Sequence, residues 1–577
     1  MKWSLKKRPD AELEALVRAH GSLLGSTLWS RGFDPADQTM IQSFLSPRMD
    51  SLHSPFLLKN MDACVERLLL ARSRNEAICI YSDYDMDGIS GLALLKSFLE
   101  ACAFKDLRHF QPDRLSEGYG VHPEALRKLH AEGVRLVITV DTGTTAFEAV
   151  TCARELGLDM MITDHHQQVG GLPETPWLIN PNQEGDRAAL GYLSGAGVAF
   201  YLCMALRSRM REQGFFGTEL AEPDLRQWLD VFCLGTIGDV VSLTEDNRTL
   251  VRAGLPYLAR TRRPGLRHLI ESVLDPSTLA NLSARDVAFS IVPKLNAASR
   301  MGEAHLSTEL LTTTDEVRAH EIVQRILDLN ALRSRTQAQI FDEALAQASR
   351  LMEARPHLRV LVLRGAWHEG VLGIVAAKIA ELFSLPSIVL AETHDGKLRG
   401  SMRTRGAYHC VKILEGAADV LDRFGGHHAA AGMQLESEKW ELFCQTLDSH
   451  VSTLYSPEGL PLETKYFDGE LSFETTPTVD EVLKLRALEP FGAGNPEPLF
   501  LLKRISLADF EKLKTTHIKM KRPLSPEMIG FSKAAELDRL REQGATSVDA
   551  LLIPEINTFR NQARVQLRIE YLRASVD

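Results

Sequence analysis

Acidic and histidine side chains follow several short apolar runs in this chain of 577 residues. The run AICIYS precedes an aspartate-rich loop, DYDMDG; VRLVITV precedes a single aspartate; and LDMMIT precedes the tripeptide DHH. A later apolar segment, VFCLGTIG, also ends at an aspartate. The positions concerned are Asp83, Asp85, Asp87, Asp141, Asp164, His165, His166 and Asp239. Carboxylates gathered at one crevice raise each other's pKa unless cations lie between them, so metal binding is the default interpretation.

The mixture of donors narrows the choice of metal. Oxygen-rich ligation with one imidazole suits Mg²⁺ or Mn²⁺, and the histidine favours manganese, since zinc usually recruits more nitrogen or sulfur. Two ions about 3.5–4 Å apart would activate a water molecule and stabilise a departing oxygen, as in phosphate-ester hydrolysis. A single aspartate after a strand is far more often a turn or N-cap residue, and aspartate-rich loops also bind calcium. The repetition after several apolar runs is what favours a metal site.

The elements that must position these residues indicate an α/β fold. Residues 77–200 alternate short apolar runs with helical patterns, which is typical of an open parallel sheet whose ligand site lies beyond the carboxyl ends of the strands. Neither glycine nor proline occurs between Gly302 and Pro356, which predicts a long helix bridging two domains. A smaller α/β pattern follows, and short strands near the C-terminus predict a β-barrel of the oligonucleotide-binding (OB) type.

Composition limits the class of protein. Lys and Arg number 66 against 76 Asp and Glu, a net charge of −10, so a nucleic acid would have to bind at local basic patches. The eight cysteines are scattered without a CxxC motif, as expected of reduced thiols in a cytoplasmic protein. The charged N-terminus lacks the apolar stretch of a signal peptide, and no run of about eighteen apolar residues predicts a membrane span.

Two basic segments stand out against this acidic background: residues 260–269 and residues 512–523. Charge runs are usually solvated faces, and that interpretation is favoured for the first segment. The second segment lies in the predicted barrel, with Phe510 and Phe531 near enough in sequence to offer stacking surfaces. A barrel with a basic stripe commonly tracks single-stranded nucleic acid without sequence preference. We call the following residues the basic stripe: Lys512, Lys514, Lys519, Lys521 and Arg522.

The ordered motifs DYDMDG, VDTG, TDHH and GDVVSL resemble those of the DHH phosphoesterase superfamily. Within it, the chain is most similar to the RecJ exonuclease family, through EGYG, NPNQ, SGAGVAFYL, LNAASRMGEA, WHEGVLGIVA and FGGHHAAAGM. The resemblance implies a metal-dependent 5′→3′ exonuclease that acts on single-stranded DNA, releases 5′-mononucleotides and serves DNA repair and recombination. The predicted domains are then a lead-in at 1–70, a DHH catalytic domain at 71–304, a connecting helix at 305–354, a DHH-associated domain at 355–455 and an OB domain at 456–577.

The resemblance also implies roles for individual residues. Two ions of Mn²⁺ or Mg²⁺ are expected on Asp85, Asp87, Asp141, His165 and Asp239, with Asp141 as a bridge. Asp83 and Asp164 are expected to shape the surroundings of the metals, and His166 to face the phosphate. Substrate contacts are expected from Asn296, Arg300, His368, Ser401, Arg403, Gly425, Gly426 and His427. The chain departs from the family pattern at Met402 and Ser299, which replace glycines, and at Tyr81, where some DHH enzymes carry a histidine.

Some of these roles also have an interpretation from the residues alone. Paired glycines let backbone N–H groups approach a phosphate, although such a pair is more often only a tight turn. An alternative enzyme is a DHH phosphodiesterase for short oligonucleotides or cyclic dinucleotides, and an alternative of another class is a non-catalytic DNA-binding scaffold. The expected partners are single-stranded DNA, a single-strand-binding protein and a helicase, and the expected state is a monomer.

Overall fold

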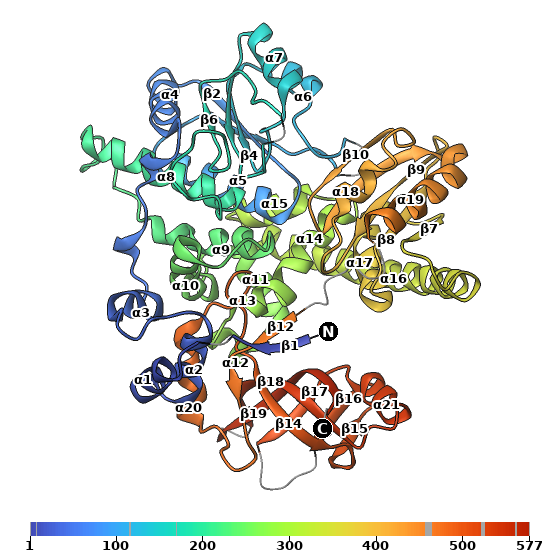
Figure 1. Cartoon of the computed structure of the whole chain (residues 1–577). Coiled ribbons are helices and arrows are strands. Elements are labelled where there is room, and N and C mark those ends of the chain that lie inside the picture. Colours follow the sequence, from blue (N-terminus) through green and yellow to red (C-terminus); the bar gives the residue numbers. More distant parts are fainter. Residues whose placement is uncertain are drawn as a thin grey trace. The chain divides into compact units, whose positions relative to one another are not determined.

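The computed structural model describes residues 2–6, 8–114, 117–168, 170–455, 464–520, 526–559 and 562–575 (Figure 1). Its contacts divide the chain into two compact units. The larger unit holds residues 53–241 and 253–461, and the smaller holds residues 1–52, 242–252 and 462–577. The boundaries of the five domains expected from the sequence stay a prediction, but residues 1–52 group with the C-terminal residues. Across the described ranges, every helix is too short or too polar to cross a membrane.

The larger unit is built first on a parallel sheet with the strand order β3-β2-β4-β5-β6. The strands are β2 (Ala77–Ser82), β3 (Leu107–Phe110), β4 (Val134–Val140), β5 (Asp159–Thr163) and β6 (Leu178–Ile179), and all pair in parallel. Every residue of β2 is buried, as expected of a strand covered on both faces. The chain runs from β2 outward to β3 and then back past β2 to β4. This reversal makes the ends of β2 and β4 a topological switch point, where ligands bind in open α/β sheets.

Helices cover both faces of this sheet. On one face α6 (Pro123–Ala131) and α7 (Phe147–Leu156) share an apolar core with β2, β4 and β5. Elsewhere α5 (Met86–Ala101) packs against α8 (Gly195–Glu212), α9 (Leu229–Gly238) and α15 (His305–Thr312). The apolar segment VFCLGTIG lies in α9, so Asp239 follows a helix whereas the other acidic motifs follow strands. The further helices of this part are α4 (Met61–Arg74), α11 (Pro264–Val273), α12 (Pro276–Ala280), α13 (Ala284–Asp286) and α14 (Val292–Arg300).

A helix of 39 residues, α16 (Glu316–Ala354), confirms the long helix expected from the absence of glycine and proline. At 1.5 Å per residue it is roughly 58 Å long. Its buried residues form two groups separated by a polar middle. The first group is Ala319, Ile322, Val323, Ile326 and Leu329, and the second is Ile340, Ala344 and Ala348. The second group packs into the core of the following sheet, so the helix joins two cores within the larger unit.

The second sheet of the larger unit has the order β10-β11-β9-β8-β7. Its strands are β7 (Leu361–Gly365), β8 (Ser387–Glu392), β9 (Lys397–Arg403), β10 (Arg423–Gly426) and β11 (Ala430–Glu436). Strands β7 and β8 are parallel, whereas β9 is antiparallel to both of its neighbours. Helix α17 (Leu372–Phe383) packs on one face, and α18 (Cys410–Glu415) and α19 (Trp440–Leu454) lie over the core on the other. The smaller α/β domain expected from the sequence is therefore present.

The smaller unit combines the N-terminal segment with a β-rich C-terminal part. Strand β1 (Lys2–Leu5) pairs in parallel with β12 (Thr464–Phe467), and helices α1 (Asp10–His20), α2 (Ser22–Ser30) and α3 (Gln38–Leu45) follow β1. A seven-stranded sheet has the order β13-β14-β18-β19-β17-β16-β15. Its strands are β13 (Gly469–Glu470), β14 (Phe500–Ser506), β15 (Phe510–Leu513), β16 (His517–Met520), β17 (Glu527–Gly530), β18 (Ser547–Phe559) and β19 (Gln562–Ala574). Helices α20 (Val479–Lys484) and α21 (Ala534–Glu542) accompany it, while α10 (Glu245–Ala259) begins in this unit.

Candidate metal centre and phosphate cavity

The loop after β2 places two aspartates at the start of α5. Asp85 is the N-cap residue, and its side chain accepts hydrogen bonds from the backbone N–H groups of Asp87 (2.8 Å) and Gly88 (3.2 Å). Asp87 accepts hydrogen bonds from the N–H groups of Gly195 (2.5 Å) and Ala196 (3.0 Å) at the start of α8. The N-terminus of a helix favours a negative charge. Two helix starts therefore hold these carboxylates in place.

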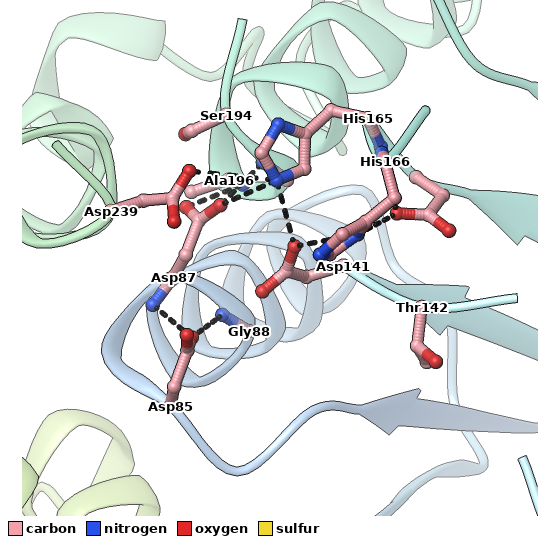
Figure 2. Close-up of polar contacts among 12 residues, drawn as sticks. Asp85, Asp87, Gly88, Asp141, Thr142, His165, His166, Ser194, Ala196 and Asp239 are labelled. Carbon is pink, nitrogen blue, oxygen red and sulfur yellow. Dashed lines mark hydrogen bonds and ion pairs between the residues drawn. The ribbon is translucent and has the colours of Figure 1, made fainter. Parts of the chain in front are cut away.

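The loop after β4 brings Asp141 toward the same point (Figure 2). Its φ of 63° lies in the left-handed region, which costs a residue with a side chain some free energy and is frequent at functional sites. His165, which follows β5, directs its Nε2 atom at three carboxylates. Nε2 lies 3.1 Å from an oxygen of Asp141, 3.5 Å from one of Asp239 and 3.8 Å from one of Asp87. One imidazole nitrogen thus faces carboxylates contributed by three different elements.

Asp164 organises the DHH loop rather than facing the other acids. Its Oδ1 accepts a hydrogen bond from the backbone N–H of His165 (2.8 Å) and lies 2.7 Å from Nδ1 of His166. Its Oδ2 accepts a hydrogen bond from the backbone N–H of Thr144 (2.9 Å). The side-chain amides of Asn180 and Asn182 donate to the carbonyl oxygens of His166 (2.8 Å) and His165 (2.6 Å). The NPNQ motif therefore fixes the backbone that carries both histidines.

Burial and crowding change the protonation of this site. Burial, followed by the neighbouring negative charges, raises the pKa of Asp87 and Asp141 and raises that of Asp83 and Asp239 to about 8. Burial opposes the protonated form of His166, but the hydrogen bond and charge of Asp164 outweigh it and raise its pKa to about 9. Oδ1 of Asp83 is buried without a hydrogen-bond donor among the described residues, and the buried Oδ1 of Asp141 has no hydrogen bond there beyond its 3.1 Å contact with His165 Nε2. Buried carboxylate oxygens of this kind fit a bound cation.

Three overlapping groups of side chains offer ligand atoms within 4.8 Å of one another: Asp87, His165 and Asp239; Asp83, Asp85 and Asp141; and Asp141, His165 and His166. All five residues expected as metal ligands belong to these groups, and Asp141 belongs to two of them, as a bridging ligand would. Asp83, expected only to shape the surroundings, belongs to the second group. We call Asp83, Asp85, Asp87, Asp141, His165 and Asp239 the acidic cluster. Its donors, mainly oxygen with one imidazole, fit two adjacent divalent ions.

A cavity of about 850 Å³ lies within the larger unit; it is lined by Tyr84, Asp164 and His166, which are sequence neighbours of the acidic cluster, and not by the residues of the cluster themselves. Asp164 and His166 line it from the parallel sheet, and residues of β9, β10 and β11 line it from the second sheet. The rings of His166 and His427 stack across it, with centroids 5.8 Å apart and an interplanar angle of 24°. Five of the expected substrate contacts share one part of this wall, which we call the phosphate cradle: Ser401, Arg403, Gly425, Gly426 and His427.

Arginines gather at the cradle without a matching number of acids. Arg403 donates to Ser401 Oγ (2.6 Å), and Arg300 donates to the Gly370 carbonyl (3.1 Å). Burial, followed by the positive charges of Arg114 and Arg403, lowers the pKa of Arg300 to about 9. Burial also lowers the pKa of Arg403. Buried cations that repel one another are suited to a bound anion, and phosphate is one of the anions that guanidinium groups bind with two parallel hydrogen bonds.

The two glycines of the cradle, Gly425 and Gly426, differ in whether a side chain would fit at their positions. Gly426 has a φ of 151°, and a Cβ there would lie 2.4 Å from the Ala430 carbonyl oxygen, so no side chain fits. A Cβ at Gly425 would meet nothing within 4 Å, so this residue leaves open space beside the cavity. Met402, which replaces a family glycine, is buried in the core on the face of β9 opposite Ser401. It therefore leaves the hydrogen bond between Arg403 and Ser401 intact.

Two expected substrate residues lie outside this wall. Asn296 and His368 are not among the described residues that line the cavity. His368 acts as an N-cap, because its Nδ1 accepts a hydrogen bond from the Gly370 N–H at 3.1 Å. Conversely, Arg114 and Tyr84 line the cavity, with the Arg114 guanidinium 4.8 Å from the centre of the Tyr84 ring. Sequence reasoning missed both, and the only signal for Arg114 was its closeness to the EGYG motif.

The basic stripe in the smaller unit carries compensating acids. Lys512 forms an ion pair with Asp538 at 2.7 Å, and Lys519 pairs with Glu527. Lys514 has a φ of 53° in the turn after β15. Lys521 and Arg522 lie outside the described residues.

The two aromatic residues beside the stripe, Phe510 and Phe531, differ in their exposure to solvent. The expectation that Phe510 offers a stacking surface is wrong, because its side chain is 4% exposed and belongs to the core of the seven-stranded sheet. Phe531 is 51% exposed and makes an edge contact with His517. In the other basic segment, Arg263 donates to the Leu311 carbonyl and lies beside Asp230, while Arg267 pairs with Glu316, as a structural role predicts.

Comparisons with known proteins agree with this arrangement. Residues 77–236 match the model of the DHH family, N-terminal domain; residues 357–453 match the DHHA1 domain; and residues 467–571 match the RecJ OB domain. The single-stranded-DNA-specific exonuclease RecJ of Dickeya dadantii is 33% identical over 98% of each chain. The Bacillus subtilis protein of the same name is 32% identical over 99% of this chain and 70% of its own length.

Solved structures give the same picture. A crystal structure of RecJ in complex with Mn²⁺ from Thermus thermophilus has a TM-score of 0.81 and 27% identity, covering 100% of this chain and 80% of that one. A structure of RecJ from the same organism in complex with Mg²⁺ has a TM-score of 0.76. The expected α/β architecture with a C-terminal OB domain is confirmed.

Proposed function

Because the chain belongs to the RecJ family of single-stranded-DNA-specific exonucleases, we propose that it hydrolyses single-stranded DNA from the 5′ end and releases 5′-mononucleotides. The observation that carries the proposal is one cavity that contains the phosphate cradle and is also lined by Asp164 and His166, the sequence neighbours of His165 in the acidic cluster. A terminal phosphate held in the cradle would leave the next phosphodiester to the acidic cluster. This arrangement favours removal of one nucleotide at a time.

The side chains divide the work in this proposal. Asp85, Asp87, Asp141, His165 and Asp239 would hold two ions of Mn²⁺ or Mg²⁺, with Asp83 close enough to contribute. When bound, such ions supply an activated water and charge stabilisation for the departing oxygen. Asp164 keeps His166 protonated at neutral pH, so that the imidazolium can donate a hydrogen bond to a phosphate oxygen. Arg300 and Arg403 neutralise the DNA backbone in the cavity.

Several finer expectations rest on the sequence and the family alone. We propose a role in DNA repair and recombination, a cytoplasmic location and a monomeric state, with a helicase and a single-strand-binding protein as partners. The remaining substrate contacts, Asn296 and His368, and the basic stripe as a track for the strand also stay proposals.

The deciding experiment compares end-labelled single strands, duplexes and dinucleotides in Mn²⁺ and in chelator, with Asp141→Ala as the inactive reference. Release of 5′-mononucleotides from long single strands, in Mn²⁺ only, is the expected result. A preference for dinucleotides would point instead to a phosphodiesterase of short substrates. Binding of the long strand without cleavage in any divalent ion would point to a DNA-binding scaffold.

A further inference from the structure

The cavity does not end at the phosphate cradle, because its wall continues along β9. Arg399, Ser401 and Arg403 alternate with core residues and so lie on one face of the strand, and all three line the cavity. Across the sheet, Ser401 pairs with Gly432, which pairs with Gly425. In the next row, Arg399 pairs with Gln434, which pairs with Arg423. We call this second set, Arg399, Gln434 and Arg423, the outer row.

The outer row lies on the side of the cradle away from the acidic cluster. His427, which stacks on His166, follows the end of β10 that carries Gly426, whereas Arg423 begins that strand. Two residues separate the outer row from the Ser401 row, which is about 6.6 Å along a strand. A phosphate on Ser401 and Arg403 would therefore lie between the acidic cluster and the outer row. The volume of about 850 Å³ is near the upper end of the roughly 300–1,000 Å³ of ligand pockets, so the wall can serve more than one phosphate.

The charges of the outer row suit further phosphates. Arg399 donates to Gln434 Oε1 (3.2 Å) and pairs with Asp395 (2.8 Å), a partly exposed ion pair of the kind that contributes little and exchanges readily. Arg423 is exposed and has no ion pair among the described residues. The nearby acids are Asp422, which lies 3.4 Å from the Gln434 amide and pairs with Lys397, and Glu369, which lines the cavity. Among the described residues, the cavity as a whole is lined by three acids, Glu117, Asp164 and Glu369, against five arginines, which are Arg114, Arg300, Arg399, Arg403 and Arg423.

We propose that the outer row is a subsite for phosphates beyond the terminal one, so that the enzyme binds and degrades strands that begin with a 5′-diphosphate or 5′-triphosphate. This inference rests on the proposed function for the position of the first phosphate. In the reaction, water adds its oxygen to the phosphorus of the second nucleotide. The bond from that phosphorus to the 3′ oxygen of the first nucleotide breaks, and this 3′ oxygen takes up a proton. The first product is then a nucleoside 5′-triphosphate with a free 3′ hydroxyl group.

The test measures binding of full-length protein, in chelator, to a single strand labelled at its 3′ end and carrying either a 5′-monophosphate or a 5′-triphosphate. The wild type is expected to bind the triphosphate strand at least about fivefold more tightly, because two guanidinium groups gain charged partners. The double variant Arg399→Gln/Arg423→Gln should reduce this ratio to within about twofold while leaving affinity for the monophosphate strand unchanged. The control Arg355→Gln/Arg405→Gln changes the net charge equally at two exposed arginines that do not line the cavity, and it should keep the full ratio.

Equal affinity of the wild type for the two strands would overturn the subsite, and so would a full ratio in the double variant. Arg423→Gln alone, at an exposed residue, provides a second variant if the double variant unfolds at a lower temperature. A hydrolysis assay in Mn²⁺ then separates the two proposals. Release of nucleoside triphosphate from the triphosphate strand supports the subsite. Failure to cut either strand would contradict the proposed nuclease, while the binding ratio would still decide the fate of the subsite.

Discussion

The acidic cluster and the basic stripe hold charge in different ways. The side chains of the acidic cluster are largely buried and converge from the ends of β2, β4, β5 and α9, and Oδ1 of Asp83 has no hydrogen-bond donor among the described residues. Lys512 and Lys519 of the stripe lie on two antiparallel strands at the surface, with Lys514 in the turn after the first of them, and Lys512 and Lys519 have carboxylate partners of their own. Repulsion among the buried carboxylates destabilises the acidic cluster, and a bound cation would relieve this repulsion. Lys512 and Lys519 of the stripe are already neutralised by their carboxylate partners.

The difference teaches where a ligand has the most to contribute. A divalent ion at the acidic cluster would replace mutual repulsion by attraction in a site of low dielectric, where each charge interaction is strong. DNA at the stripe must compete with existing ion pairs and with water, and salt screens such exposed charges. Substitutions should therefore have large effects at the acidic cluster, intermediate effects at the cradle and small effects at the stripe.

The largest effect is expected from Asp141→Ala. Asp141 belongs to two of the three groups of possible ligands, so its loss should weaken both ion positions. We expect kcat on single-stranded DNA to fall by at least about 10³-fold, equivalent to roughly 4 kcal/mol of transition-state stabilisation. Asp106→Asn, which removes an exposed carboxylate paired with Arg108, is the control and should keep full activity. If kcat of the Asp141→Ala enzyme were within tenfold of the wild-type value, the expectation that substitutions have larger effects at the acidic cluster than at the basic stripe would be wrong.

At the cradle, Arg403→Gln should lower kcat/KM by about 10–100-fold on strands with a 5′-phosphate. Hydrogen bonds between charged groups contribute roughly 1.5–3 kcal/mol, and Arg403 is already held in place by its contact with Ser401. Strands with a 5′-hydroxyl group should lose much less, because they offer no terminal phosphate. If both strands lose activity equally, Arg403 serves the fold or the whole strand rather than the terminal phosphate.

Removing divalent ions should make stability depend on pH through the acidic cluster. The pKa values of Asp83 and Asp239 rise from 3.8 to about 8 in the fold, so the folded protein retains protons that the unfolded chain loses. This contribution to stability is complete below about pH 4 and is lost as the pH rises toward 8. In chelator, Tm should therefore fall between pH 5 and pH 8, and Mn²⁺ should raise Tm by more at pH 8 than at pH 6. An increase in Tm that is the same at both values would argue against metal binding at these carboxylates.

The sequence predicted the acidic cluster better than the surfaces that receive the strand, and the reason is geometric. Asp83, Asp141 and Asp164 each follow an apolar strand, and the carboxyl ends of parallel strands share one edge of a sheet. Arg114 lies in a loop, and its neighbours Tyr84 and Arg403 come from distant elements, so only tertiary packing brings them together. Side chains alternate between the two faces of a strand, so the alternation decides whether Phe510 points into the core or toward solvent. The four residues of β15 are too few for the sequence pattern to show which. The pairing of β1 with β12 joins residues more than 400 positions apart, which no local pattern reveals.

The smallest effect is expected at the stripe, from Lys512→Gln/Lys519→Gln. Each free lysine that contacts a phosphate contributes close to one unit to the slope of log K against log salt concentration. Because both lysines already have carboxylate partners, we expect the slope for a long strand to fall by about one unit in total, and affinity by about two- to fivefold. Hydrolysis of very short substrates should not change, since they do not reach beyond the cavity. Asp538→Asn, which frees Lys512, should act in the opposite direction and steepen the slope. If the double variant lost activity equally on long and on very short substrates, the proposal that the stripe contacts the DNA strand would be wrong.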